Sequence, residues 1–357
     1  MKKRSYVGMD LGDRNHEVCV LNESGQVERR DTVVNTAEAL TKYFPRLAKG
    51  TPVAIEAGTH SGWISRQLEA MGLHVIVAQP RKLRALWGRD RKNDASDAEL
   101  LARMLRADPQ LLHPIVHRSE QAQIDILTVR SRDALVQTRT KLVNAARGMA
   151  KSLGHRLPAA STTCFATKAR AALPVGLQPA LLPILDSVGN LSVQIKSMDR
   201  QIEQTAKERY PQTARLREVS GVGALTSLAF VLTVADPTRF RRSREVGPYL
   251  GLVPKQDQSG SLDKQLHITK AGDGYLRRLL VGSAQYILGS FGPACGLRCF
   301  GQRLAARGGK NAKRRAVVAV ARKLAVLLHK LWVSDAVYDP TRGLDPATIA
   351  DLQMQPM

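Results

Sequence analysis

Five short β-rich segments within roughly the first 80 residues limit the folds open to this chain. The first, "SYVGMDLG" at 5–12, is apolar and ends in glycine, and the next two flank the turn signal "NESGQ" within 16–35. A helical segment near 37–47, a strand "PVAIEAG", a helix near 62–71 and a strand "HVIVAQP" then alternate. Three successive strands followed by this alternation predict a mixed sheet with helices packed against it.

That order of strands is the one found in ribonuclease H-like nucleases. A long helical region is expected at 81–105, after the last strand. The remainder of the chain favours helices, so the fold class expected is α/β followed by α.

Four acidic residues occupy informative places on this expected sheet. Asp10 interrupts an apolar strand near its middle, where a carboxylate is costly unless it is paired or binds a metal. Glu56 ends the strand "VAIEAG", at the edge where open α/β sheets bind ligands. Asp94 and Asp97 are three residues apart and would share one face of a helix.

Together these acids predict a magnesium site. Mg²⁺ takes oxygen ligands, and two such ions about 4 Å apart can stabilise the attacking and leaving oxygens of a phosphodiester. Other interpretations stay open: Asp94 and Asp97 are also typical of a helix start, and Glu56 is also an ordinary residue for a strand end.

Two long helices are expected in the middle of the chain. The first covers 117–157 and the second begins near Leu182, with a Pro-, Thr- and Ala-rich patch at 157–176 between them. Such helices can fold back as a hairpin, pair between chains, or face a common core. The domains expected are 1–125 (catalytic), 126–210 (helical, dimerising), 211–335 (C-terminal) and a tail, 336–357.

The charge of the chain indicates a polyanionic partner. Lys and Arg number 54 against 31 Asp and Glu, which gives a net charge of +23. Aromatic residues make up only 4%, so a membrane-surface protein and stacking on single-stranded bases are both disfavoured. Nucleic acid is the leading candidate.

Several segments of the second half are candidates for nucleic-acid contact. Gly221-Val222-Gly223 resembles the turn of a helix-hairpin-helix, whose amides hold a phosphate, although a plain turn between helices is nearly as good an interpretation. Clustered basic residues add phosphate contacts, or form ordinary solvated faces. The candidate residues are Gly221, Gly223, Arg239, Arg241, Arg242, Lys270, Arg277, Arg278, Lys313, Arg314 and Arg315.

A cytosolic protein is expected from the remaining features. No apolar run reaches the ~20 residues needed to cross a membrane, and the basic N-terminus lacks the apolar stretch of a signal peptide. The four cysteines are too few for a disulfide framework, and the pair Cys295 and Cys299 favours packing over a zinc site.

The stretch "VPKQDQSGSLDKQ" contains a Ser-Gly pair at Ser259 in a polar setting. By itself the pair predicts a turn, and no His or Asp stands nearby in a triad order. If carboxylate-held magnesium activates the hydroxyl, a mobile loop is the expected setting for it. Ser261 is the alternative nucleophile.

Two blocks of motifs resemble the insertion-sequence-110 family of transposases. "GMDLG", "IEAG" and "KNDASDA" resemble its DEDD acids, and "SGVGALTS", "DPTRFRRSREVGPYLGLVPKQDQSG" and "ITKAGDGYLRRLL" resemble its C-terminal domain. The resemblance implies a RuvC-like, ribonuclease H-like domain that binds Mg²⁺ through Asp10, Glu56, Asp94 and Asp97.

The resemblance also implies a mechanism and partners. Ser259 aligns with the serine that forms a covalent phosphoserine link to DNA. A noncoding bridge RNA would pair with donor and target DNA, a coiled coil would form the dimer, and two dimers would form a tetramer. Whether the serine meets the acids within one subunit or across a dimer is open. The alternatives are a nuclease or junction resolvase acting by hydrolysis, and a non-catalytic basic nucleic-acid-binding protein.

Overall fold

The computed structural model describes residues 5–80, 82, 94–256, 258–259, 262–263, 266–342 and 344, with the backbone alone at 258–259 and 262–263. The chain divides into two compact units, an N-terminal unit, Met1–Glu120, and a C-terminal unit, Gln121–Met357. Each unit has its own hydrophobic core. The four expected domains are not tested by this division and stay a prediction.

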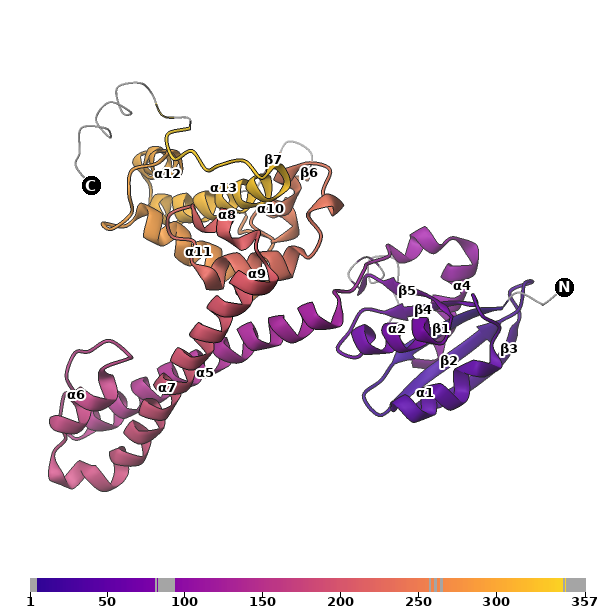
Figure 1. Ribbon diagram of the computed structural model, residues 1–357, viewed down its shortest axis with the longest axis horizontal. Helices are drawn as coiled ribbons and strands as arrows, with labels where there is room; N and C mark the ends of the chain where they lie inside the picture. The colour runs from indigo at the N-terminus through magenta and orange to yellow at the C-terminus, as the bar shows by residue number, and fades with distance from the viewer. Residues whose placement is uncertain are drawn as a thin grey trace. The chain divides into compact units, whose positions relative to one another are not determined.

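A five-stranded mixed sheet forms the centre of the N-terminal unit (Figure 1), with the order β3-β2-β1-β4-β5. Strands β1, β2 and β3 are antiparallel neighbours, and β4 and β5 continue the sheet parallel to β1. The predicted mixed sheet is confirmed, and its arrangement is consistent with a ribonuclease H-like fold. The strands are β1 (Tyr6–Leu11), β2 (Asn15–Leu21), β3 (Val27–Val34), β4 (Pro52–Glu56) and β5 (His74–Ala78).

Helices cover both faces of this sheet because its strands are apolar on both sides. Val7 and Met9 of β1 pack in one core cluster with Leu40 of α1 (Ala37–Tyr43) and Leu68 of α2 (Ser61–Ala70). The other face meets α4 (Asp94–Ala107). Most of the helical region expected at 81–105 before Asp94 lies outside the described residues. Two 3-10 turns, η1 (Phe44–Arg46) and η2 (Pro109–Leu112), complete the unit.

The two long middle helices fold back on each other within one chain. Helices α5 (Glu120–Ser152) and α7 (Gln178–Arg209) are antiparallel (Figure 1). Arg132 pairs with Asp199 at 2.8 Å, and the Arg139 guanidinium donates to the Ser192 hydroxyl at 3.2 Å. These contacts establish an intrachain hairpin and leave pairing between chains as a prediction.

The patch expected to interrupt the helices contains a helix of its own. Helix α6 (Phe165–Ala171) and the 3-10 turn η3 (Val175–Leu177) lie there, and Phe165 is fully buried in a cluster with residues of α5 and α7. The Pro-, Thr- and Ala-rich composition concealed this element because a single buried phenylalanine supplies its anchor.

The rest of the C-terminal unit is a helical bundle around α9 and α13. All but the first two residues of α9 are buried, and α13 contributes Leu324 and Leu328 to the same core. The elements are α8 (Thr213–Arg217), α9 (Ala224–Val234), η4 (Pro237–Arg239), η5 (Ser243–Glu245), α10 (Val246–Tyr249), α11 (Gly274–Leu288), α12 (Gly296–Ala306) and α13 (Ala312–Ser334).

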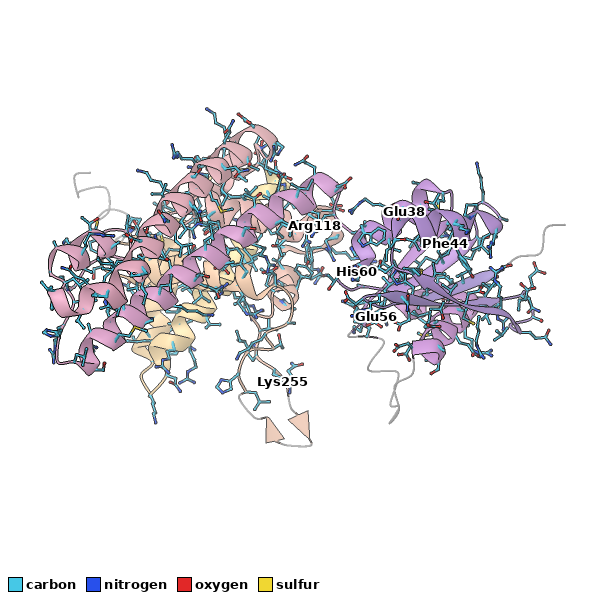
Figure 2. The ribbon with its side chains drawn as sticks, turned by 90° about the horizontal axis from the view of Figure 1, so that it is seen from below. Glu38, Phe44, Glu56, His60, Arg118 and Lys255 are labelled. Carbon is cyan, nitrogen blue, oxygen red and sulfur yellow. The ribbon has the colours of Figure 1, made fainter. Side chains whose placement is uncertain are left out.

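Ser259 lies in a hairpin rather than in the irregular loop expected from its polar surroundings. Strands β6 (Gln258–Ser259) and β7 (Leu262–Asp263) pair antiparallel, with Ser259 opposite Leu262. Closer to the bundle, the Lys255 amide donates to the His267 carbonyl at 2.9 Å, and Figure 2 shows Lys255 on this arm. Backbone pairing of this kind needs no apolar pattern, which is why the sequence gave no sign of it. Ser261 lies outside the described residues.

In the part of the chain that the structure describes, no helix combines the length and the apolar character that crossing a membrane requires.

Candidate metal centre

Two of the four predicted acids lie at the same edge of the sheet. Parallel pairing places Met9 of β1 beside Ile55 of β4, so Asp10 and Glu56 each follow at the next register position. Glu56 is the last residue of β4, as predicted. Asp10 is the next-to-last residue of β1 and half-buried, so the prediction of a mid-strand position was wrong.

Gly8 allows helix α4 to approach this edge. A Cβ atom at Gly8 would lie 2.0 Å from the Ala98 carbonyl oxygen and 2.5 Å from the Ala102 amide nitrogen, both in the backbone of α4. Atoms cannot approach that closely, so only glycine permits this packing. Because alternate residues of a strand share a face, Asp10 lies on the same face as Gly8, toward α4.

The first turn of α4 supplies the other two predicted acids. Asp94 and Asp97 both lie in this turn, Asp94 exposed and Asp97 half-buried. One carboxylate oxygen from each of Asp10, Asp94 and Asp97 lies within 4.8 Å of the others. Glu56 is not in this group. The structure therefore brings three of the four predicted acids together.

The electrostatics of α4 differ sharply within two residues. Glu99 accepts hydrogen bonds from Arg103 and Arg30, and these hold the pKa of its carboxyl below the usual range. In the described part of the chain, neither Asp94 nor Asp97 has an ion pair with a basic side chain. Each pair of like charges about 4 Å apart costs roughly 1 to 4 kcal/mol near a surface. Three oxygen donors in this arrangement suit a hard divalent cation, which would remove that repulsion.

Sequence reasoning missed an acid and a histidine beside this group. Glu17 of β2 pairs directly with Asp10 across the antiparallel ladder and accepts a hydrogen bond from the Thr32 hydroxyl at 3.0 Å. The hairpin register would have revealed it, since cross-strand partners share a face. His60 follows Glu56 in the loop that leads into α2 (Figure 2), with its Nε2 atom 3.3 Å from Asp13.

The predicted nucleic-acid residues differ in what already holds them. The Arg277 guanidinium donates to the carbonyls of Leu250 and Ala271 at 2.9 and 2.7 Å, which ties α11 to the preceding loop. Arg239 stacks on the rings of Phe240 and Tyr249. The residues with exposed side chains are Arg241, Arg242, Lys270, Lys313, Arg314 and Arg315.

The glycine pair forms the predicted turn between two helices. Gly221 adopts a left-handed conformation with φ of 84°, and Gly223 is the N-cap residue of α9. The structure thus confirms a turn here, and its contact with phosphate stays a prediction.

Comparison with known families completes the description. A DEDD transposase family model, described as "Transposase", matches residues 7–154, and a second, "Transposase IS116/IS110/IS902 family", matches residues 213–297. The chain belongs to the IS110 family of transposases. The first match contains all four acids, and the second contains Ser259 and the glycine turn.

Relatives of this transposase cover most of its length. A probable family 20 transposase of Pseudomonas aeruginosa is 29% identical over 94% of this chain and 99% of its own length. The transposase for insertion sequence element IS1111A of Coxiella burnetii is 28% identical over 81% of this chain and 79% of its own. The pilin gene-inverting protein of Moraxella bovis is 29% identical over 45% of this chain and 48% of its own. The protein is thus an enzyme that recombines DNA.

Proposed function

We propose that this transposase cuts and exchanges donor and target DNA strands under the guidance of a structured bridge RNA. Asp10, Glu56, Asp94 and Asp97 would bind Mg²⁺, and Ser259 would be the nucleophile. The observation that carries the proposal is the meeting of three aspartates at one sheet edge, inside the region that matches the DEDD family. The bridge RNA rests on the family resemblance and on the net charge of +23.

Rigid elements hold the proposed ligands. Asp10 is fixed by β1, and Asp94 and Asp97 by a helix turn that Gly8 seats against that strand. Bound there, Mg²⁺ would polarise a DNA phosphate and stabilise charge on the attacking and leaving oxygens. Glu56, one register step along the neighbouring strand, completes the proposed set.

The proposed covalent step conserves the phosphodiester. The Ser259 hydroxyl oxygen would form a bond to a DNA phosphorus while the bond from that phosphorus to a deoxyribose oxygen breaks. The serine loses its proton, and the released sugar oxygen gains one. Attack by the hydroxyl of a second strand would reverse the step and complete the exchange without an external energy source. The hairpin β6–β7, near whose tip Ser259 lies, would carry the serine to the DNA.

Assembly is proposed to use the helical hairpin. Helices α5 and α7 extend as a long antiparallel pair, and Ile124 and Leu127 of α5 and Val193 of α7 are exposed on them. Apolar side chains exposed on long helices favour association between copies. A dimer formed through this hairpin, and a tetramer of two dimers, are therefore part of the proposal.

A denaturation-resistant protein–DNA adduct is the direct test of the proposal. Purified protein, the RNA transcribed beside its gene, and donor and target DNA would be incubated with Mg²⁺ and analysed on a denaturing gel. Wild type should give an adduct. Ser259→Ala should abolish it, and Ser261→Ala should retain it as the matched control.

Each other outcome has a definite meaning. Cleaved DNA without an adduct in wild type, with Ser259→Ala still cleaving, would indicate metal-dependent hydrolysis by the acids alone. Loss of the adduct in Ser261→Ala but not in Ser259→Ala would move the nucleophile by two residues. Recombination that proceeds equally well without the RNA would overturn guidance and leave the serine chemistry intact.

A further inference from the structure

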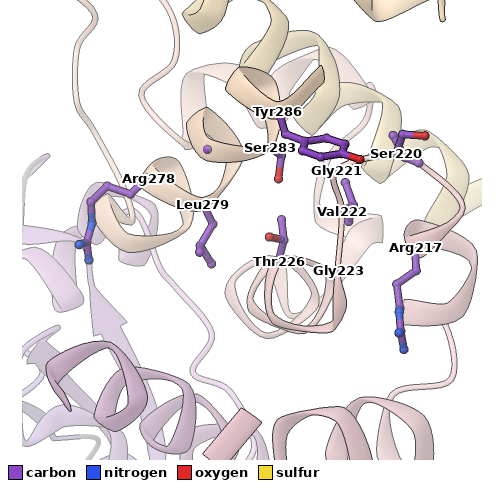
Figure 3. A pocket seen from close by; sticks show the side chains of 12 residues that line it. Arg217, Ser220, Gly221, Val222, Gly223, Thr226, Arg278, Leu279, Ser283 and Tyr286 are labelled. Atoms are coloured by element: carbon purple, nitrogen blue, oxygen red, sulfur yellow. The ribbon is translucent and has the colours of Figure 1, made fainter. Parts of the chain in front are cut away.

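A cavity of about 620 Å³ lies within the C-terminal unit, where the glycine turn meets helix α11. The turn, the start of α9 and the second half of α11 form its walls (Figure 3). It belongs entirely to residues 217–286, far along the chain from the predicted acids. The lining residues used below are Arg217, Val222, Thr226, Arg278, Ser283 and Tyr286.

Two nearly buried hydroxyl groups point into this cavity. Thr226 of α9 is 7% exposed and Ser283 of α11 is 5% exposed, and Figure 3 shows the oxygens of both facing the open space. Within the described part of the chain, neither hydroxyl has a hydrogen-bond partner. The next residue, Ser227, behaves normally and donates to the Gly223 and Ala224 carbonyls at 3.0 and 3.1 Å. A buried hydroxyl without a partner costs about 1 to 3 kcal/mol, so a ligand is the expected partner for this pair.

The start of α9 adds backbone donors to the same cavity. Its N-cap residue is Gly223, which has no side chain to accept a hydrogen bond from the first-turn amides. Those amides carry the positive end of the helix dipole and favour an anion. The eleven residues of α9 make this a full helix terminus rather than a single turn.

Gly221 fixes the turn against α11. Its φ of 84° suits glycine, and a Cβ atom there would lie 3.0 Å from the Tyr286 ring and 3.1 Å from the Ser283 carbonyl oxygen. The amides at the start of α9 and the hydroxyl of Ser283 are therefore held in one arrangement by close backbone packing.

Charge and apolar surface around the cavity define the ligand further. Arg217 and Arg278 flank it, and each uses one nitrogen for a carboxylate, Glu203 at 2.5 Å and Asp133 at 2.6 Å. Each guanidinium keeps further N–H groups for an anion. Val222 and Tyr286 offer apolar contacts of the kind that a sugar ring makes. The volume exceeds what a phosphate alone would fill.

We infer that this cavity binds one sugar–phosphate unit of a DNA backbone. The Thr226 and Ser283 hydroxyls and the α9 amides hold the phosphate, and Val222 and Tyr286 contact the deoxyribose. The inference rests on the DNA-recombining activity of the family and adds an anchoring position at a distance in sequence from the acids. DNA is preferred to RNA because no side chain with a carboxylate or amide group lines the described cavity to read a 2′-hydroxyl.

Removal of the two hydroxyls tests the inference without changing charge. The double variant Thr226→Val and Ser283→Ala keeps the shape of the cavity, and Thr233→Val is the matched control. Thr233 lies on the same helix and is 4% exposed, but it does not line the cavity. Duplex DNA affinity should fall roughly 10- to 100-fold in the double variant, because hydrogen bonds to a charged group are strong. The control should bind as wild type does.

A phosphate scan identifies the bound group. Duplexes that carry one neutral methylphosphonate at successive positions should weaken wild-type binding at one position per anchored strand, and the double variant should be insensitive at that position. Its salt dependence should stay unchanged, since no charge was removed, whereas Arg278→Gln should lower the slope by about one ion.

Opposite results separate this inference from the proposed function. Equal DNA affinity of wild type and double variant, or a scan that loses no position, would overturn the cavity and leave the covalent chemistry untouched. A loss confined to RNA binding would overturn the choice of DNA. Wild type that fails to bind DNA at all would contradict the family activity itself.

Discussion

The two units of the chain treat their aspartates in opposite ways. In the N-terminal unit, Asp10, Asp94 and Asp97 lie within 4.8 Å of one another, and neither Asp94 nor Asp97 pairs with a basic side chain in the described part. In the C-terminal unit, aspartates on the long helices pair with arginines from other elements. These pairs are Asp125–Arg209, Asp133–Arg278, Asp199–Arg132 and Asp273–Arg130.

The difference separates structural acids from acids suited to a ligand. An aspartate paired with arginine joins two helices, and its charge is neutralised within the fold. Three aspartates that face one another work against folding unless a cation arrives. The predictions below, from the largest expected effect to the smallest, test whether this distinction between the units is real.

Replacing Asp97 by Asn should have the largest effect. Loss of one metal ligand should lower strand exchange by ~100-fold or more, the scale on which loss of electrostatic stabilisation at a reacting phosphate acts. It should also remove the rise in unfolding temperature that Mg²⁺ or Mn²⁺ causes in wild type, because binding to the folded state is the source of that rise. Thermal unfolding with and without the metal measures the second effect independently of activity.

The matched control for this variant lies on the same helix. Glu99→Gln removes a carboxylate that Arg30 and Arg103 already neutralise, so the metal-induced shift should persist. If Glu99→Gln loses the shift as completely as Asp97→Asn does, the three-aspartate group is not the metal centre.

Replacing Asp125 by Ala should have the largest effect on stability. This carboxylate is 2% exposed and accepts hydrogen bonds from Arg209 and from the Tyr210 hydroxyl, the latter at 2.8 Å. Breaking a buried pair from one side costs about 3 to 5 kcal/mol. Urea unfolding followed by the circular dichroism of the helices should show it. Asp199→Ala, in the same hairpin but 47% exposed, should cost less than ~1 kcal/mol.

The sheet and three of its acids could be predicted because each leaves a pattern in the sequence. Val7 and Met9 flank Gly8 in an apolar run that indicates a buried strand, and Asp94 and Asp97 have the spacing of one helix face. The strand-end position of Glu56 was predicted, but its distance from the other carboxylates depends on packing that sequence does not encode locally.

Other features could not be predicted, for physical reasons. The hydroxyls of Thr226 and Ser283 stand among apolar helix residues, and their meeting depends on how α11 packs against the glycine turn. The hairpin that contains Ser259 is held by backbone hydrogen bonds between polar residues, which have no hydrophobic period. Single residues that act through tertiary packing are invisible to a periodicity argument.

Buried histidines extend the comparison between the units. His329 in the C-terminal unit contacts the Ser243 hydroxyl at 3.0 Å and the Pro237 carbonyl at 2.9 Å, one with each ring nitrogen. His16 in the N-terminal unit is fully buried, and neither of its ring nitrogens has a hydrogen-bond partner among the described residues. His329→Leu should therefore cost about 1 to 3 kcal/mol at pH 7.5, whereas His16→Leu should be close to neutral.

Acidification should reverse the advantage of wild-type His16. Burial lowers the pKa of His16 from its usual value, so the folded state favours the neutral ring. Below about pH 6.5 the unfolded chain takes up a proton that the folded chain resists, and stability should fall by up to ~1.4 kcal/mol per pH unit. Urea unfolding at pH 7.5 and pH 5.5 should show a smaller drop in His16→Leu than in wild type. An equal drop would mean that His16 does not govern the acid sensitivity of this unit.

The smallest effect is expected from Asp186→Asn at the end of the helical hairpin. Asp186 pairs with Arg170, yet the two side chains are 58% and 48% exposed, so water and salt screen the pair. The substitution should change the free energy of unfolding by no more than ~0.5 kcal/mol, and 0.5 M salt should abolish even that difference. Burial, not the mere presence of an arginine partner, is what makes Asp125 important in this argument. A loss at Asp186 as large as the loss at Asp125 would show that arginine pairing alone stabilises the C-terminal unit, and the contrast with the unpaired aspartates of α4 would then rest on charge balance rather than on burial.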